Sequence, residues 1–245
     1  MKLFANGCSF TWGGAIYPDL HDDKGELLDY ANTTELNQQR LATVWPSKLG
    51  KLIDATETVN MGMGCGSNDR IVRTTMDYFA HLLEQGQELS DWLAVIQWTQ
   101  AHRYEYWDDE TNTWAMVIPN GISFGKRVKW SYTESKEYER NITYSYLNDT
   151  SFSQKYFTQV VGLASFFDQH KIKYRFMNLS IDHISGLNTA QVNYLTKNIK
   201  WVGDNVYITI NNMFKDAHES KHPTVVGHDQ IASNLFRYIK NDISN

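Results

Sequence analysis

Three side chains near the two ends of the chain have the types and spacing that nucleophilic acyl chemistry needs. Ser9 lies in the stretch NGCSFTWGG, between a short apolar run and a pair of glycines. Glu219 and His222 lie close together in ESKHP, near the other end. A carboxylate can orient an imidazole ring, and the ring can then take a proton from a serine hydroxyl. If the fold joins the two ends of the chain, these residues can form one catalytic triad.

Each piece also has a purely structural interpretation. A serine in a glycine-rich turn is a common turn residue or helix cap, and a histidine before a helix that opens with Pro223 is a common loop residue. The functional interpretation requires all three side chains in one crevice. The elements that position them therefore decide between the two interpretations.

Strands and helices are predicted to alternate along the chain. The expected strands are 2–5, 57–60, 92–98, 172–177 and 205–210. The expected helices are one that opens at Pro46 and those at 69–83, 154–169, 189–199 and 224–241. This alternation predicts a flavodoxin-like three-layer α/β/α sandwich around a central parallel sheet of about five strands.

The predicted topology brings the candidate residues together. The segment WLAVIQW is almost entirely apolar, which is typical of a central parallel strand covered on both faces. Strand-to-helix loops of such a sheet lie at one edge. We therefore expect the loops 6–14, 60–68 and 98–103 to face one crevice.

Residues 101–150 depart from the alternation and are predicted to be an aromatic-rich insertion, irregular or β-hairpin in structure, within a single domain that covers 1–245. IPNG at 118–121 reads as a turn. The Trp and Tyr residues of the insertion are Tyr104, Tyr106, Trp107, Trp114, Trp130, Tyr132, Tyr138, Tyr144 and Tyr146. Two interpretations stay open: flat rings that bind a sugar or a partner protein, or a small satellite core.

Composition argues against several classes of function. The formal net charge is -5 and no long Lys/Arg cluster occurs, so we expect no binding to nucleic acid or to an anionic membrane. No apolar run approaches the roughly 20 residues that span a bilayer, and the N-terminus lacks a signal-peptide run, which predicts a cytoplasmic protein. With only 2 cysteines the chain is not a disulfide scaffold.

Four blocks of the sequence occur in an order that resembles the SGNH superfamily, also called GDSL esterases and lipases. The blocks are NGCSFTWG, VNMGMGCGSND, VIQWTQ and ESKHPTVVGHDQIA. The first block is most similar to a divergent GCSFT-type branch that is frequent in tailed-phage and bacterial genomes, which implies virion association if the chain is phage-encoded. The resemblance covers about 3–103 and 155–240 and leaves out the insertion and residues 15–40.

The resemblance assigns roles to the three residues described first. Ser9 would be the nucleophile, His222 the general base, and Glu219 the orienting acid where most relatives have Asp. The longer Glu side chain can serve only if its loop accommodates it.

The resemblance also implies an oxyanion hole built from the backbone N–H of Ser9, an N–H among Gly64, Cys65 and Gly66, and a side chain of the third block. Each such donor lowers the barrier by roughly 3–4 kcal/mol. Thr99 stands where the family has Asn, and a hydroxyl reaches less far. Gln97 or Gln100 would compensate only with an inward side chain.

Asn68 and Gln100 lie within the second and third blocks, Arg103 lies just past the third, and all three are predicted to contact the substrate. Arg103 could bind a substrate carboxylate or form an ion pair with Glu105, and the ion pair is the simpler interpretation.

No metal or cofactor is predicted. His218, His222 and Asp216 cluster, but no second cluster supplies further ligands at a recognisable spacing. Cys8 and Cys65 could be a redox pair or a thiol nucleophile, although small buried apolar fillers are the favoured interpretation. His228 is predicted to be a helix residue near the crevice.

The leading functional prediction is a serine hydrolase, an esterase or deacetylase that removes a short acyl group from a carbohydrate or a similar polar molecule. The partner would then be a small-molecule or glycan ester. One alternative is an acyltransferase on the same fold. The other is a catalytically weak module that binds a glycan or a protein through the insertion, which the departures at Thr99 and Glu219 motivate.

Overall fold

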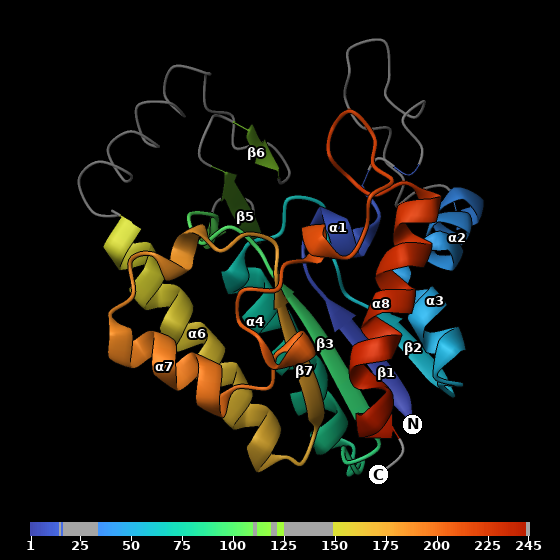
Figure 1. The fold of residues 1–245 in the computed structure, drawn as a ribbon, viewed down its shortest axis with the longest axis horizontal. Coiled ribbons are helices and arrows are strands. Elements are labelled where there is room, and N and C mark those ends of the chain that lie inside the picture. The colour runs from blue at the N-terminus through green and yellow to red at the C-terminus, as the bar shows by residue number, and fades with distance from the viewer. Residues whose placement is uncertain (15, 17–33, 110–111, 119–121, 125–148, 244–245) are drawn as a thin grey trace.

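A computed structural model describes residues 1–14, 16, 34–109, 112–118, 122–124 and 149–243 of the chain. Two sheets lie within this part. One is a four-stranded parallel sheet in the order β2-β1-β3-β7, and the other is a three-stranded antiparallel sheet in the order β4-β5-β6. The parallel sheet is the centre of the fold (Figure 1).

The parallel sheet consists of strands that the sequence predicts almost to the residue. They are β1 (Lys2–Asn6), β2 (Glu57–Asn60), β3 (Trp92–Trp98) and β7 (Lys173–Asn178). Every residue of β3 is buried, as expected for a central strand covered on both faces. The order places β1 and β3 side by side in the middle, with Ala5 opposite Val95. Loops after β1, β2 and β3 therefore leave the sheet at the same edge.

Helices cover both faces of this sheet. The α-helices are α1 (Ser9–Trp12), α2 (Thr34–Thr43), α3 (Trp45–Leu52), α4 (Asn68–Glu84), α6 (Asp149–Gln169), α7 (Thr189–Asn198) and α8 (Val225–Ile243), and the short 3-10 helices are η2 (Asp182–Ile184), η3 (Val202–Asp204) and η4 (Ile210–Asn212). Together with the sheet they form the predicted three-layer α/β/α sandwich.

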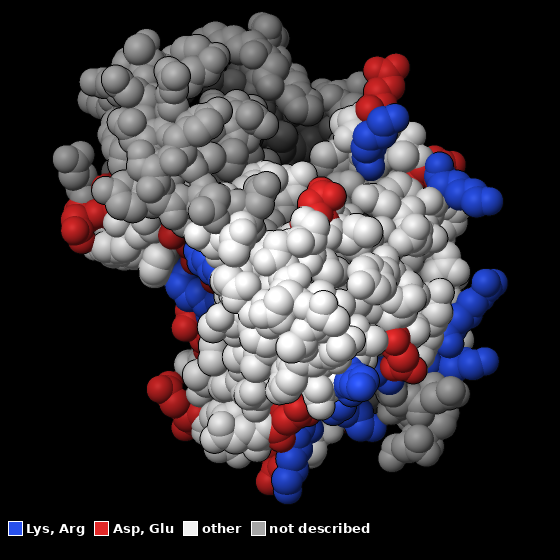
Figure 2. Space-filling model, turned by 60° about the vertical axis from the view of Figure 1, so that its left-hand side comes forward, with Lys and Arg blue, Asp and Glu red and all other residues white. Residues whose placement is uncertain are grey.

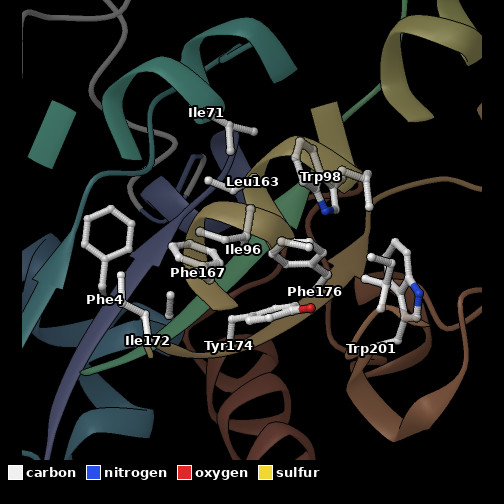
Figure 3. Close-up of a cluster of buried hydrophobic side chains, with 14 of the residues drawn as sticks. Phe4, Ile71, Ile96, Trp98, Leu163, Phe167, Ile172, Tyr174, Phe176 and Trp201 are labelled. Atoms are coloured by element: carbon white, nitrogen blue, oxygen red, sulfur yellow. The ribbon is translucent and has the colours of Figure 1, made fainter. Parts of the chain in front are cut away.

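Alternate residues of the strands feed two separate cores. Leu3 and Val95 point to the core that α3 and α8 cover. Phe4 and Ile96 point to the opposite core, where α4 and α6 pack. Figure 3 shows how densely rings fill this second core, with Phe167 of α6 lying close to Phe176 of β7 at a centroid distance of 6.1 Å. The alternation locks the register, because a shift by one residue would exchange the two faces.

The fifth strand predicted at 205–210 is absent from the described sheet. Its place beside β7 holds only isolated parallel bridges, Phe176 with Trp201 and Asn178 with Thr209. The Phe176 N–H donates to the Lys200 carbonyl at 2.9 Å and Asn178 Nδ2 donates to the Val206 carbonyl at 2.8 Å, so single hydrogen bonds and not a continuous ladder hold the segment beside β7. β-branched residues made the segment resemble a strand, but its polar groups are satisfied locally by turns and η4.

The described part of the insertion is a small antiparallel sheet made of β4 (Tyr104–Asp108), β5 (Thr113–Ile118) and β6 (Ile122–Phe124). A partly buried ion pair joins it to α4, since Arg73 Nε and Nη2 lie 2.7 and 3.0 Å from the two carboxylate oxygens of Glu105. Arg73 also stacks on the Trp114 ring at 4.4 Å. Trp107 and Trp114 remain 45% and 41% exposed, and the predicted turn at 118–121 lies largely outside the described residues.

Candidate active site

The loop that carries Ser9 is anchored by the last residue of β1. Asn6 is fully buried, and its Oδ1 accepts a hydrogen bond from the Gly7 N–H at 2.9 Å. Its Nδ2 donates to the carbonyl of Ile71 and to the hydroxyl of Thr75 in α4, at 3.2 and 2.9 Å. The end of β1 is therefore tied to the neighbouring helix before the chain turns into α1.

Gln97 is the main support of the same loop, and the sequence did not assign it this role. Its Oε1 accepts hydrogen bonds from the Cys8 N–H at 3.1 Å and from the Thr11 hydroxyl at 3.2 Å, while its Nε2 donates to the Trp98 carbonyl at 2.8 Å. A side chain committed to these groups is not an inward-turned oxyanion donor. The available signal was a lone amide in an otherwise apolar central strand.

Ser9 and His222 meet at this edge of the sheet. Ser9 is the first residue of α1 and is only partly buried. Its Oγ lies 2.8 Å from His222 Nε2, in the loop just before α8. Figure 1 shows that loop beside α1, at the end of the sheet opposite the two chain termini. The structure thus brings together two residues that are 213 positions apart in the sequence.

The surroundings of His222 favour its neutral form. Burial lowers the pKa of His222 below 6.5, a hydrogen bond to the Ser220 backbone opposes this, and the charges of Arg103 and His218 lower it further. The ring packs against Phe10 at a centroid distance of 4.9 Å. Its Nδ1 lies 3.2 Å from the Ser220 hydroxyl, which helps to orient the ring. A neutral imidazole facing a serine hydroxyl can accept that hydroxyl's proton.

Gly14 closes over the Ser9–His222 pair. A Cβ atom added at this position would lie 3.0 Å from Ser9 Cβ and 3.2 Å from His222 Cδ2. The absence of a side chain therefore allows the two partners their present separation. The second glycine of the Gly-Gly pair after Ser9 is thus a functional position that sequence reasoning noted without a role.

Glu219, the predicted orienting acid, forms no hydrogen bond or ion pair with His222 in the described structure. The Glu219 side chain is exposed, and none of the hydrogen bonds or ion pairs among the described residues joins it to the imidazole. Asp216 is also engaged elsewhere, because its Oδ1 accepts a hydrogen bond from the Thr224 hydroxyl at 2.6 Å. In this structure the second ring nitrogen of His222 is served by Ser220 instead.

The second block forms a tight turn beside Ser9. The Gly66 N–H donates to the Met63 carbonyl at 3.0 Å, so Gly66 is already committed. No hydrogen bond among the described residues uses the N–H groups of Ser9, Gly64 or Cys65. Cys65 has a positive φ of 62°, an uncommon conformation for a residue with a side chain. These three N–H groups are the candidates for oxyanion donors.

Neither cysteine has the character of a nucleophile. Both thiols are free. Cys8 is fully buried, and its Sγ lies 3.3 Å from Gln97 Oε1. Burial raises the pKa of the Cys65 thiol, with a smaller opposing effect of Arg103, which disfavours a thiolate.

Asn68 links the second and third blocks and is not placed to bind substrate. It is 2% exposed, its Oδ1 accepts from the Thr99 N–H at 2.8 Å, and its Nδ2 donates to the Thr99 carbonyl at 3.2 Å. The amide satisfies both backbone groups of Thr99. The Thr99 hydroxyl is itself fully buried and has no hydrogen-bond partner, so it is available to donate a hydrogen bond.

Gln100 lines a cavity of about 160 Å³ where β3 and β7 end. The cavity walls carry mostly polar side chains. They are Gln100, Ala101, His102, Phe152, Ser153, Ser180, Asp182, His183 and Ser185. Ser153 is 1% exposed and its hydroxyl has no hydrogen-bond partner. Because β3 lies parallel to β1 and next to it, this cavity and Ser9 are both at the C-terminal ends of the strands.

The predicted ion pair between Arg103 and Glu105 does not form. Glu105 is held in two hydrogen bonds by Arg73, which reaches it from α4. Arg103 Nε and Nη1 are buried and have no hydrogen-bond partner. The sequence could not show this, because Arg73 is closer in space to Glu105 although it is far away along the chain.

The described residues contain neither a cluster of metal-ligating side chains nor a helix that could span a membrane. Within these ranges no group of three or more His, Cys, Asp or Glu could hold a metal ion. Among the described helices, none has both the length and the hydropathy required to cross a bilayer. On the face that Figure 2 shows, the described Lys and Arg side chains are scattered and mixed with Asp and Glu, and form no basic stripe.

His228 lies in α8, as predicted, and is fully buried. Its Nδ1 accepts a hydrogen bond from the Trp45 N–H at 3.2 Å, which joins α8 to α3. Burial, with a smaller contribution from Lys48, lowers the pKa of His228 to about 3. The residue anchors the helix that follows the His222 loop.

Known proteins with similarity to this chain include a family and a remotely similar solved structure. A family model described as "Family of unknown function (DUF6071)" matches residues 25–242, a range that includes His222 and begins after Ser9. The chain is also similar to a solved structure from Desulfitobacterium hafniense DCB-2, described as "a putative lipolytic protein of G-D-S-L family". That similarity has 14% identity and a TM-score of 0.47, and covers 97% of this chain and 98% of the other. No curated protein matches the chain.

Proposed function

We propose that this chain, which belongs to the DUF6071 family of unknown function, is a serine hydrolase that cleaves a short acyl ester. The observation that carries the proposal is the 2.8 Å contact between Ser9 Oγ and His222 Nε2. A serine hydroxyl paired with a neutral imidazole at an accessible sheet edge is the arrangement that activates serine as a nucleophile. The same pair is what the resemblance to SGNH hydrolases implies.

In the acylation step, Ser9 Oγ bonds to the ester carbonyl carbon while His222 Nε2 takes the hydroxyl proton. The carbonyl oxygen becomes the oxyanion of a tetrahedral intermediate. When that intermediate collapses, the bond to the alcohol oxygen breaks, and the imidazolium gives its proton to the departing alcohol. Ser220 keeps the ring oriented during both proton transfers through its contact with Nδ1.

In the deacylation step, water takes the place of the alcohol. The water oxygen bonds to the acyl carbon while His222 accepts a proton from the water. Collapse of the second intermediate breaks the bond to Ser9 Oγ, and the proton returns to the serine. The products are the carboxylic acid and the free enzyme.

The oxyanion would be bound by the N–H groups of Ser9, Gly64 and Cys65, which are not used by other hydrogen bonds among the described residues. Each donor that is aimed at the developing charge contributes roughly 3–4 kcal/mol. The buried and unpaired hydroxyl of Thr99 is a further candidate from the third block. It stands in place of the family's Asn.

The alcohol part of the ester is proposed to be polar, with a carbohydrate as the leading candidate. The support is the cavity at the ends of β3 and β7, which Ser153, Ser180 and Ser185 line. The Ser153 hydroxyl has no hydrogen-bond partner, whereas the hydroxyls of Ser180 and Ser185 donate to Asp182 and can still accept. Its volume of about 160 Å³ fits a single small ring or a part of one. Hydroxyl-lined cavities provide both donors and acceptors, which a polyhydroxylated molecule requires.

The first test is labelling with a fluorophosphonate, followed by peptide mass spectrometry. We expect an adduct on Ser9 that is absent in Ser9→Ala and in His222→Ala. Hydrolysis of 4-nitrophenyl acetate should fall at least about a thousandfold in Ser9→Ala, since the nucleophile is lost. Ser90→Ala, at an exposed serine between α4 and β3, is the matched control and should behave as the unmodified protein.

Turnover that survives Ser9→Ala, or an adduct on another residue, would overturn the proposal. Circular dichroism and a urea titration of each variant separate loss of chemistry from loss of the fold. A well-folded protein with neither an adduct nor turnover would favour the binding-module alternative.

Acyl transfer is the second candidate, and the same cavity favours it, because a bound alcohol could take the acyl group from Ser9 in place of water. Product analysis distinguishes the two reactions. Hydrolysis alone gives free acid at every concentration of added sugar. Transfer gives an acylated sugar whose yield rises and saturates with sugar concentration.

A further inference from the structure

Arg103 is a partly buried cation, two of whose guanidinium nitrogens have no partner, and it lies in the loop after β3 at the end of the sheet where catalysis is proposed. Its Nε and Nη1 are shielded from solvent and have no hydrogen-bond partner. Leaving charged donors unsatisfied in a protein interior is costly, and such groups are normally paired. Two unsatisfied guanidinium nitrogens in the turn directly after Thr99 therefore indicate that their partner arrives with a ligand.

The fold removes the carboxylate that would otherwise neutralise this cation. Glu105, two residues further along, is 2% exposed in its side chain and is bound through both oxygens by Arg73. Asp69, the next acidic residue of that cluster, accepts from Lys155 Nζ at 2.7 Å and from Gln159 Nε2 at 2.7 Å. Both acids thus already have partners of their own.

The backbone places Arg103 at the candidate site. Its N–H donates to the Gln100 carbonyl at 3.2 Å, which closes the turn directly after Thr99. The positive charge of Arg103 acts on both Cys65 and His222: it partly offsets the rise that burial causes in the pKa of Cys65, and it adds to the lowering that burial causes in the pKa of His222. The guanidinium is therefore within electrostatic reach of the second block and of the proposed general base.

We propose that Arg103 binds an anionic group, a carboxylate or a phosphate, that the ester substrate carries in addition to its acyl linkage. The inference rests on the proposed hydrolase function and names the class of substrate. A guanidinium presents donors in a fork that matches a carboxylate or a phosphate in two parallel hydrogen bonds. The oxyanion of the transition state is a poorer candidate for the partner of Arg103, because it exists only after the ester has been attacked. An anionic group of the substrate would pair with Arg103 for as long as the substrate is bound.

Anion binding is tested without turnover in the Ser9→Ala protein. The probes are succinate and inorganic phosphate, and the readout is the NMR titration of the His222 imidazole. A bound anion offsets the charge of Arg103, so the pKa of His222 should rise when either probe binds. Arg103→Gln should abolish the rise and Arg103→Lys should keep part of it, while Arg237→Gln, on the exposed surface of α8, should leave it unchanged.

Selectivity is tested in the active protein with mono-4-nitrophenyl succinate and 4-nitrophenyl butanoate, an anionic and a neutral ester of similar length. We expect kcat/KM to favour the anionic ester, and the ratio of the two values to fall at least about tenfold in Arg103→Gln, mainly through KM. The neutral ester serves as the internal reference for folding. Comparing a phosphate-bearing ester with the succinate identifies which anion is preferred.

The outcomes separate the two proposals. Anion binding that depends on Arg103, without turnover of any ester, keeps the anion site and rejects the hydrolase. Turnover with a ratio that Arg103→Gln leaves unchanged keeps the hydrolase and rejects the anion site. An equal loss of kcat for both esters assigns Arg103 to the oxyanion instead and also overturns the inference.

Discussion

The two arms of the candidate site are held in very different ways. The nucleophile loop, residues 6–14, packs on a buried network in which Asn6 and Gln97 form hydrogen bonds with backbone and side-chain groups of the loop and of α4. The histidine loop, residues 216–224, is largely exposed and is closed by its own backbone, with the His218 N–H on the His222 carbonyl at 2.9 Å. One arm is positioned by the core, and the other by the helix that follows it.

The difference teaches which part of the chemistry is preorganised. Buried amide networks resist displacement because each broken bond leaves a polar group unsatisfied. The histidine loop has no such support, and its position depends on α8, which is anchored by Ile231, Leu235 and Ile239 in the core. Substitutions in the first arm should therefore cost stability, whereas those in the second should change activity or pH response.

The largest effect is expected for Gln97→Leu. The change removes the acceptor for the Cys8 N–H and the Thr11 hydroxyl and leaves both buried without a partner. We expect a loss of about 2–5 kcal/mol in the free energy of unfolding, measured by urea titration, together with loss of ester hydrolysis. Gln87→Leu, at an exposed glutamine, is the control. A stable and active Gln97→Leu protein would show that the first arm does not need this network.

The next largest effect is expected for Gly14→Ala, which introduces a steric clash where the nucleophile loop meets the histidine loop. The added Cβ would lie 3.0 Å from Ser9 Cβ and 3.2 Å from His222 Cδ2, so the imidazole must shift. A displacement of this kind should lower kcat about 10- to 100-fold, with little change in stability. Gly162→Ala in α6 adds a Cβ with nothing within 4 Å and is the matched control. Equal kcat values for the two variants would contradict the prediction.

The third effect is a loss of stability in acid, which tests how α8 holds the histidine arm. Burial lowers the pKa of His228 to about 3 and that of His183 to about 4, while both are near 6.5 when unfolded. Below pH 6.5 the unfolded chain binds protons that the native state excludes. The free energy of unfolding should therefore fall as pH falls from 6.5 toward 4, by up to about 1.4 kcal/mol per pH unit for each histidine.

Urea midpoints at pH 7.0, 5.5 and 4.5 measure this slope. His228→Asn keeps an acceptor for the Trp45 N–H but cannot titrate, so its slope should be shallower. His81→Asn, at an exposed histidine, should keep the full slope. Parallel slopes for all three proteins would indicate that acid unfolding begins elsewhere.

The smallest effect is expected for Glu219→Gln. The side chain is exposed and forms no hydrogen bond or ion pair with His222, so kcat/KM should change less than about threefold, or about 0.6 kcal/mol in barrier height. Ser220→Ala, which removes the hydroxyl 3.2 Å from His222 Nδ1, should have the larger effect of the two. A loss of a hundredfold or more in Glu219→Gln would mean that Glu219 reaches the ring during turnover, as the SGNH resemblance implies.

The elements that were predicted best are those whose residues carry a strong local pattern. β2 and β3 begin and end where the runs ETVN and WLAVIQW do, and α4 differs from its prediction by a single residue at each end. The segment 205–210 failed because its β-branched residues resemble a strand regardless of what lies beside them. Whether a strand forms there depends on a free edge of β7 and on competing local hydrogen bonds, and neither is visible along the chain.

The candidate site divides in the same way. Ser9 and His222 could be predicted, because glycine-rich and His-Pro blocks occur in a recognisable order. The partners of their neighbours could not: Glu105 pairs with Arg73 and not Arg103, Asn68 serves Thr99, and Gln97 supports the nucleophile loop. The sequence by itself determined the layered α/β architecture and the two residues that meet. The tertiary structure alone decided which polar groups satisfy one another, because a hydrogen bond depends on distance and direction in space, which separation along the chain does not specify.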